Sequence, residues 1–220
     1  MPDHKDDSET RAALSRRQFL KGVGVVGAGS GLAAELLAPE TAEAEPGPLQ
    51  EPPAGASLKP GFMAITLNVN GQPTTMQIEP RTTLLNALRN HAEPPITGPK
   101  LVCDQGACGC CTVHVDGKTM YSCMQLAVDV VGKQITTVEG LSRGGKLSPL
   151  QQAFVEKDAM MCGFCTPGFV MSLEALLKTN TNPTLEQVKS ACAGNTCRCG
   201  TYPHIFEAAM AAAGKLRGGA

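Results

Sequence analysis

The sequence carries almost no net charge and no tryptophan. Its 19 Lys and Arg nearly balance 20 Asp and Glu, for a formal charge of −1 at pH 7. A chain without a strong field of either sign has no electrostatic footprint for nucleic acid or for a charged lipid surface, so neither is expected as a partner. Cysteine is also absent from residues 1–102, although the chain has 10. Chemistry that depends on cysteine is therefore confined to the later part of the chain.

Long hydrophobic runs are scarce as well, and the one near the N-terminus is weak. Residues 22–38 are apolar but rich in glycine, and they are too short to span a bilayer stably. They follow SRRQFLK, whose paired Arg16 and Arg17 are typical of a twin-arginine export signal. AEA at 42–44 has small residues where a signal peptidase reads them. We predict a signal peptide over 1–44, export through the twin-arginine translocon, a periplasmic location and no membrane span in the mature chain.

Folded structure is expected to begin at Phe62. The preceding residues, 45–61, are rich in proline, glycine and alanine and lack periodic apolar positions, so they are predicted to form a linker. Two β-rich runs then flank Asn70 and Gly71, a pair typical of a tight hairpin turn. A second hairpin is predicted around DG at 116–117, followed by a further strand in QITTVEGL.

A short helix is predicted between the two hairpins. TTLLNALRNH places leucines at 84, 85 and 88 behind threonine caps. A small mixed sheet with one covering helix and a cysteine-rich loop has the shape of a plant-type ferredoxin, a β-grasp fold. Residues 62–141 are assigned to this ferredoxin-like domain.

Beyond residue 141 the β-branched runs stop and helix signals replace them. SPLQ at 148–151 and TLEQ at 184–187 are capping boxes, and the first has proline at the opening position of its helix. Pro167 opens another helix in the same way, and YPHIF begins the last one. Residues 142–220 are therefore predicted to form an all-α domain of four helices, with cysteines at the helix ends. The predicted fold class is α+β.

The first cysteines are spaced as in plant-type ferredoxins. The x4 and x2 intervals in CDQGACGCCTV give three ligands of a [2Fe-2S] cluster, and a cysteine after the following hairpin supplies the fourth. The predicted ligands are Cys103, Cys108, Cys111 and Cys123. We call these four residues the first thiol group. Gly106 and Gly109 permit the positive φ angles that turn backbone N–H groups toward sulfur. Cys110 is surplus and is expected to point away from the iron.

A second group combines CGFC and CRC. It offers four ligands again, enough for a second [2Fe-2S] cluster. These are Cys162, Cys165, Cys197 and Cys199. We call these four residues the second thiol group. Both pairs lie beside predicted helix starts, where free N–H groups favour thiolates. Cys192 is left over, and at helical spacing from Leu185 and Val188 it is predicted to be a core residue.

Disulfides and zinc are the alternatives for these cysteines. Disulfides suit an exported protein, but the C-x2-C and C-x-C pairs are cramped for local bonds. A zinc site with four cysteines accepts two C-x2-C pairs, but not an x4-x2 series with a distant fourth ligand. A Rieske centre is not indicated either, because His4, His91, His114 and His204 have no ligand spacing among themselves.

The motifs CDQGACGCCTV, CGFCTPG and GNTCRCGTYPHI together resemble the three iron–sulfur motifs of the molybdenum hydroxylases, the family of xanthine dehydrogenase and aldehyde oxidoreductase. The resemblance covers residues 62–214. It implies two [2Fe-2S] clusters, one in a ferredoxin-like domain and one in a four-helix domain. Taken with the export signal, it makes the chain most similar to the small subunits of periplasmic aldehyde oxidoreductases. Two positions depart from the family pattern, where alanine is usual at Cys110 and glutamine at Met161.

The resemblance implies an electron-transfer subunit with no catalytic residue and no substrate site of its own. A large subunit would hold the molybdenum pterin cofactor, and a flavin or cytochrome c subunit would hold FAD or haem. By the same resemblance Cys199 lies beside the pterin, so the cluster of the helical domain would receive electrons first. Two alternatives remain open. One is a free-standing periplasmic two-cluster ferredoxin or redox sensor, and the other is a structural or binding domain stapled by its cysteines.

Overall fold

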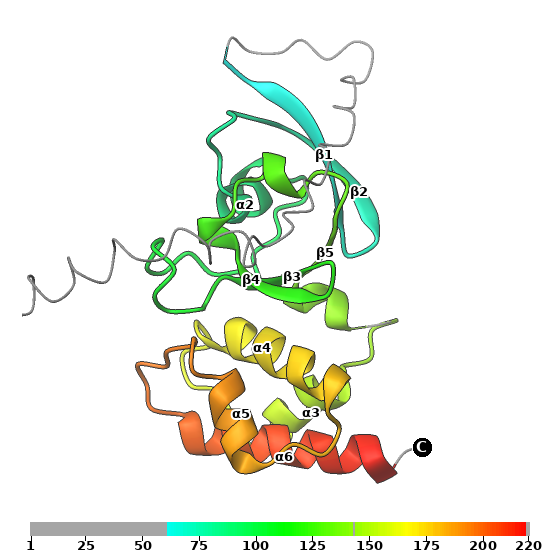
Figure 1. Ribbon diagram of the computed structural model, residues 1–220, viewed down its shortest axis with the longest axis vertical. Helices are drawn as coiled ribbons and strands as arrows, with labels where there is room; N and C mark the ends of the chain where they lie inside the picture. The colour runs from blue at the N-terminus through cyan, green and yellow to red at the C-terminus, as the bar shows by residue number, and fades with distance from the viewer. Residues whose placement is uncertain (1–60, 143, 219–220) are drawn as a thin grey trace, which may run out of the picture. The chain divides into compact units, whose positions relative to one another are not determined.

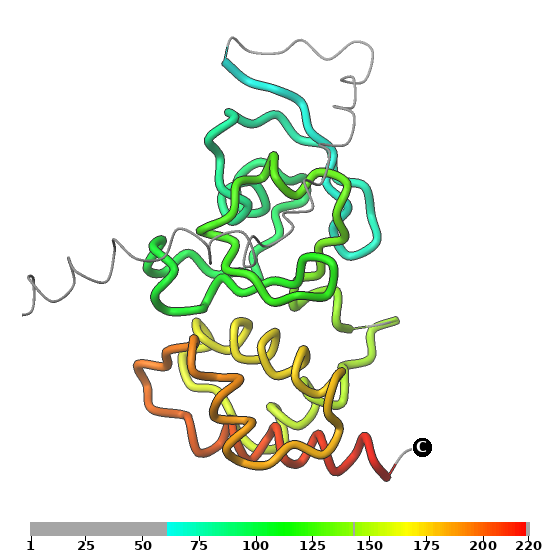
Figure 2. The backbone as a smooth tube through the Cα atoms, in the orientation of Figure 1, coloured from blue at the N-terminus to red at the C-terminus, as the bar shows by residue number. Residues whose placement is uncertain are grey.

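The computed structural model describes residues 61–142 and 144–218. The predicted signal peptide, and the predicted linker up to residue 60, lie outside the described residues. Figure 1 shows strands and a short helix in the earlier part of the described chain and helices in the later part, and Figure 2 traces the backbone through both. We call these parts the sheet half (61–141) and the helical half (144–218).

Five strands form one mixed sheet in the described residues. They are β1 (Met63–Val69), β2 (Gln72–Ile78), β3 (Thr112–Val115), β4 (Lys118–Tyr121) and β5 (Gln134–Thr136). The order in the sheet is β2-β1-β5-β3-β4, with β1 and β5 parallel and the other neighbours antiparallel. The strand predicted in QITTVEGL is shorter than expected, because the chain leaves the sheet after Thr136 and forms a 3₁₀ turn over Val138–Leu141.

Both hairpins turn at the dipeptides that the sequence marks. Asn70 and Gly71 have φ angles of +54° and +80°, and Asp116 and Gly117 have +49° and +80°. Two successive residues with positive φ make a turn whose twist matches that of the flanking strands. The two predicted hairpins are therefore confirmed, and the second one places Tyr121 at the start of the segment that carries Cys123.

A short helix packs on the sheet, as predicted. α2 (Leu84–Asn86) begins after Thr83, whose hydroxyl accepts the N–H of Asn86, and continues as a π-helical turn over Ala87–His91. Leu84 and Leu88 are fully buried in one core with the sheet. The sheet contributes Leu67, Ile78, Val113 and Ile135 to that core. Each fully buried side chain of this kind contributes roughly 1.5–3 kcal/mol.

Four α-helices lie in the described part of the helical half. They are α3 (Pro149–Glu156), α4 (Thr166–Thr179), α5 (Leu185–Ala191) and α6 (Tyr202–Gly218). Both predicted capping boxes are present: the hydroxyls of Ser148 and Thr184 accept N–H groups of Gln151 and Gln187, and these glutamines accept the cap N–H in return. No described helix has the length and apolar character that crossing a bilayer requires.

The face predicted for α5 is only partly correct. Val188 and Cys192 are 0% and 3% exposed, but Leu185 is 45% exposed. Leu185 is the first residue of α5 and Cys192 is its C-cap. The three residues predicted to share one face therefore span the entire helix, and the first of them, Leu185, lies outside the helical core.

Hydrogen bonds join the two halves beside the cysteine segments. His114 on β3 is buried, and its Nε2 lies 2.8 Å from the carbonyl oxygen of Met171 on α4. Since a carbonyl only accepts, the imidazole is the donor and carries its proton on Nε2. Tyr121, at the end of β4, donates its hydroxyl to the carbonyl of Gly194 at 3.0 Å.

Candidate iron–sulfur sites

The first thiol group lies in the loop before β3 and in the turn after β4. Cys111 and Cys123 are buried, with their Sγ atoms 3.4 Å apart. Leu85 and Tyr121 pack around them. Cys103 and Cys108 are partly exposed.

Backbone N–H groups of this loop point at the sulfur of Cys103. The N–H of Gln105 is the main cause that lowers the pKa of Cys103 to about 7, and the side chain of Cys108 and further N–H groups act in the same direction against burial. Gly106 and Gly109 have φ angles of +70° and +67°, as the sequence predicts. Asp104 also adopts a positive φ, +53°, which the sequence analysis did not anticipate. Such a nest of N–H groups suits an anionic sulfur centre.

The second thiol group lies at the N-terminal ends of α4 and α6. Cys162 and Cys199 are exposed, and their Sγ atoms are 3.5 Å apart. Cys165, the N-cap of α4, is buried, as is Cys197. Burial raises the pKa of Cys165 to about 12, and the neighbouring Cys197 adds to this effect.

Donors around Cys197 favour its thiolate. Burial opposes the charge, but the hydroxyl and N–H of Thr201, with further donors, lower the pKa of Cys197 to about 7. The Sγ atom lies 3.0 Å from the Thr201 hydroxyl oxygen. The N–H of Cys197 is in turn bonded to the hydroxyl of Tyr202 at 2.9 Å, which holds this cysteine against the start of α6.

Four of the sulfurs lie in the two pairs measured above. The side chain of Cys108 also shifts the pKa of Cys103, and that of Cys197 shifts the pKa of Cys165, while Cys108 acts on the pKa of Cys110 as well. All ten cysteines are free thiols in the described residues. Within those residues no three side chains of Cys, His, Asp or Glu gather as they do around a single metal ion. A [2Fe-2S] cluster binds two side chains at each of two irons, so the paired donors fit it.

The two remaining cysteines are buried in the helical core. Cys110 and Cys192 are each 3% exposed and pack with Phe169 and other apolar side chains. Burial raises the pKa of both thiols to about 12. The thiol of Cys110 faces the carbonyl of Cys108 at 3.8 Å. The prediction that Cys192 is a core residue is confirmed.

Exposed apolar side chains surround both thiol groups. Met161 is 72% exposed next to Cys162, and Phe164 is exposed within the same CGFC segment. Leu101 and Val102 are exposed beside Cys103, and Met124 beside Cys123. Contiguous exposed apolar patches are typical of surfaces that contact other proteins. Sequence reasoning did not predict the exposure of these side chains, because exposure depends on the packing of distant segments.

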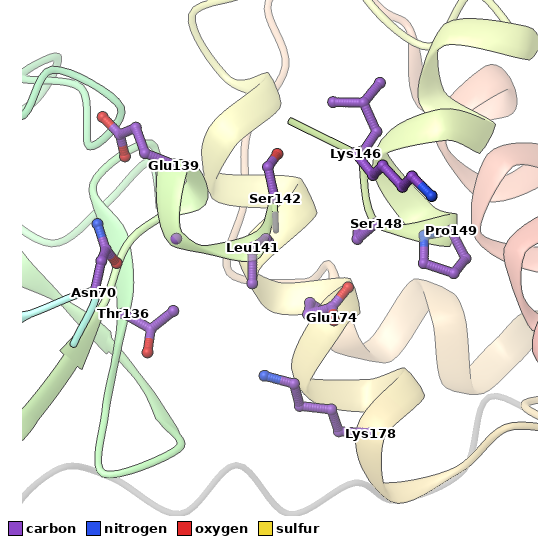
Figure 3. A pocket seen from close by; sticks show the side chains of 12 residues that line it. Asn70, Thr136, Glu139, Leu141, Ser142, Lys146, Ser148, Pro149, Glu174 and Lys178 are labelled. Carbon is purple, nitrogen blue, oxygen red and sulfur yellow. The ribbon is translucent and has the colours of Figure 1, made fainter. Parts of the chain in front are cut away.

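A cavity of about 840 Å³ lies elsewhere, along α4 and the segment that joins the two halves. Figure 3 shows Asn70, Thr136 and Glu139 on one side of it and Ser148 and Pro149 on the other, with Glu174 and Lys178 projecting from α4. Burial raises the pKa of Glu174, while Lys178 acts in the opposite direction. None of the cysteines lines this cavity.

Comparison with protein families assigns the chain to a class of iron–sulfur proteins. Residues 66–166 match a 2Fe-2S iron-sulfur cluster binding domain, and residues 137–210 match a [2Fe-2S] binding domain. Residues 13–33 match the signal sequence of the twin-arginine translocation pathway.

Curated relatives are small subunits of oxidoreductases. The chain is 47% identical over 152 residues to the nicotine 6-hydroxylase small subunit of Paenarthrobacter nicotinovorans, which covers 69% of this chain and 90% of the relative. It is 38% identical over 177 residues to the aldehyde oxidoreductase iron-sulfur-binding subunit of Escherichia coli, with 74% and 76% covered.

The solved structures that this chain resembles are also oxidoreductases. Quinoline 2-oxidoreductase of Pseudomonas putida 86 matches with a TM-score of 0.68 and 42% identity over 72% of this chain and 98% of that chain. Aldehyde oxidoreductase of Desulfovibrio gigas matches with a TM-score of 0.66 and 37% identity over 72% of this chain and 18% of that longer chain. The chain thus belongs to the iron–sulfur subunits of the molybdenum hydroxylases, the family of xanthine and aldehyde oxidoreductases.

Proposed function

We propose that the chain holds two [2Fe-2S] clusters, one at each thiol group. The observation that carries this proposal is the pairing of the sulfurs, with two thiols for each iron. The proposed pairs are Cys103 with Cys108, Cys111 with Cys123, Cys162 with Cys199, and Cys165 with Cys197. When bound, the clusters supply one-electron redox chemistry. The protein itself supplies the ligands and their surroundings.

Backbone N–H groups and burial are the means by which this chain would adjust the reduction potential of the cluster at each site. N–H groups directed at ligand sulfurs offset the negative charge of the bound centre and raise its reduction potential. In the first thiol group these donors include Gln105 and Ala107, and in the second they include Thr201. Cys111 and Cys123 are shielded from water by Leu85 and Tyr121.

We further propose that the chain carries electrons within a molybdenum-dependent aldehyde oxidoreductase. A large subunit with a molybdenum pterin cofactor would supply them, and a subunit with FAD or haem would accept them. The exposed apolar side chains beside both thiol groups support docking on two sides. We assign the entry of electrons to the second thiol group, because its outer cysteines, Cys162 and Cys199, are exposed, whereas the outer cysteines of the first group are only partly exposed.

The domain organisation proposed with this function follows the two halves. Residues 62–141 would form the ferredoxin-like domain and 142–220 a four-helix domain, each holding one cluster. The signal would cover 1–44, with a linker at 45–61, and the assembled protein would act in the periplasm. The match of residues 13–33 to a twin-arginine signal supports export.

Iron and labile-sulfide analysis of the exported protein tests the cluster proposal. We expect about four irons and four sulfides per chain. A count near two would leave one thiol group without a cluster, and a count near zero would favour a structural domain. Native mass measurement on the same sample tests the complex, because a lone chain would favour a free-standing ferredoxin or redox sensor. Activity on aldehydes and on N-heteroaromatic compounds then separates the substrate classes.

A further inference from the structure

The two cysteine loops are bonded to each other through their backbones. Thr196, one residue before Cys197, donates its N–H to the carbonyl of Cys108 at 2.9 Å. The next carbonyl, that of Gly109, accepts the side-chain amide Nδ2 of Asn195 at 3.0 Å. Two successive carbonyls of the first loop therefore accept hydrogen bonds from the second, and the Gly109 carbonyl also accepts the hydroxyl of Thr112 at 2.6 Å and its N–H at 3.1 Å.

Asn195 is itself fixed on both sides. It is 5% exposed, and its Oδ1 accepts the hydroxyl of Ser172 on α4 at 2.7 Å. Its backbone N–H is bonded to the carbonyl of Cys192 at 2.9 Å. Since the Gly109 carbonyl only accepts, the NH₂ end of the amide must face it, and this leaves Oδ1 to accept the Ser172 hydroxyl. The side chain therefore has one orientation and no solvent competitor.

Three glycines allow the loops to approach this closely. A Cβ atom on Gly109 would overlap the carbonyl of Gly194, one on Gly168 would overlap the carbonyl of Gly109, and one on Gly194 would overlap the Tyr121 hydroxyl. Each contact is made to a group of the opposite half. Glycine is needed at such positions because only a missing side chain leaves room for the neighbouring backbone.

Holding these carbonyls also fixes N–H groups of the first loop. In a trans peptide the C=O and N–H point in opposite directions, so fixing the Cys108 and Gly109 carbonyls fixes the N–H directions of Gly109 and Cys110. N–H dipoles near an iron–sulfur centre set its potential. A side chain in the helical half therefore contacts the backbone of the loop that carries Cys108 and Cys111.

We propose that Asn195 is a positioning residue for the first thiol group, acting from the helical half through the carbonyl of Gly109. This inference rests on the proposed function, in which that group binds a [2Fe-2S] cluster. Loss of the amide would remove the Asn195 donor from the Gly109 carbonyl and leave the two donors of Thr112, so the peptide between Gly109 and Cys110 is expected to reorient toward Thr112. Because N–H dipoles stabilise the reduced, more negative centre, we expect a more negative midpoint potential at the first site.

The test compares three variants of the full-length chain, isolated with its iron and with any subunits that co-purify. Asn195→Leu removes the amide at similar volume, and Ser172→Ala removes only its anchor. Asn180→Leu is the matched control, since its amide bonds Gln187 and Asn182 within the helical half. Midpoint potentials and paramagnetic resonance signals of both centres are measured, with each signal assigned by its loss in Cys103→Ser or Cys162→Ser.

We expect Asn195→Leu to shift the potential and the signal of the first centre, Ser172→Ala to shift them less in the same direction, and Asn180→Leu to leave them unchanged. Full iron content with unchanged potential in Asn195→Leu would overturn the inference, even if thermal stability fell. If that variant does not fold, an unchanged potential in Ser172→Ala overturns it. A wild-type count well below about four irons per chain would instead count against the proposed function.

Discussion

Single cysteines in this chain differ chiefly in what surrounds their sulfur atoms. Cys110 and Cys111 are neighbours, and both are buried. The sulfur of Cys111 is paired with Cys123, whereas Cys110 packs in the helical core and faces a carbonyl. Adjacent residues of one loop therefore belong to different surroundings, and burial alone does not identify a ligand.

The contrast between these two residues leads to a prediction about iron content. Cys110→Ala should keep about four irons per chain and lose roughly 1 kcal/mol of unfolding free energy, because a small core side chain is shortened. Cys111→Ala should lose one cluster, about two irons. Iron analysis and urea unfolding of the two variants, purified in parallel, check both statements. Loss of a cluster in Cys110→Ala would show that the ligand assignment is wrong.

Short elements of the fold are stabilised by contacts within a few residues. α3 begins at a capping box in which Ser148 accepts the N–H of Gln151 and Gln151 accepts the N–H of Ser148. Pro149 supplies the fixed φ of the first helical position. Each of these contacts joins residues at most three positions apart, so the local sequence is enough to predict them.

The capping hydroxyl of α3 can be tested by its removal. Ser148→Ala should lower the unfolding free energy by about 1 kcal/mol, the usual effect of removing an N-cap side chain. Ser190→Ala makes the same substitution at an exposed position inside α5 and should change stability little. Urea denaturation of both variants gives the comparison. Equal effects of the two substitutions would contradict a capping role for Ser148.

The hairpins, caps and cysteine spacings could be predicted because each depends on residues close in sequence. Asn70 with Gly71 specifies a turn by backbone conformation alone, and the cysteine intervals predict a ligand set, which stays a prediction, without reference to the fold. The hydrogen bonds that Asn195 makes between the two cysteine loops could not be predicted, since Asn195 and Gly109 lie 86 positions apart in the sequence. The exposed Leu185 could not be predicted for a similar reason. Sequence spacing identifies the face of a helix, but the extent of the core decides which turns of that face are buried.

Contacts between the halves are a property of the whole described chain, and the one made by His114 is expected to depend on pH. Burial lowers the pKa of His114, nearby Lys178 acts in the same direction, and the bond to the Met171 carbonyl opposes them. In the unfolded chain the imidazole titrates near its ordinary pKa of about 6.5. Below that value the unfolded state binds more protons than the folded state, so stability falls as the pH falls.

His114→Gln should remove this pH dependence while keeping a donor for the Met171 carbonyl. The wild type should lose stability between about pH 7.5 and about pH 5.5, and the variant should lose less over the same interval. Urea midpoints at the two pH values measure the difference. An identical loss in both proteins would show that the imidazole at this contact is not the titrating group.

The match of residues 13–33 to a twin-arginine signal links the first residues of the chain to the proposed cluster sites. The twin-arginine route carries folded cargo, and clusters are assembled in the cytoplasm, so folding around iron should precede export. Arg16→Lys with Arg17→Lys should therefore leave cluster-loaded protein in the cytoplasm and little in the periplasm. Arg11→Lys makes the same change outside the paired arginines and should export normally. Iron content and protein amount in the two cell fractions measure the effect. Normal periplasmic accumulation of the double variant would show that the chain, or a partner travelling with it, leaves the cytoplasm by another signal.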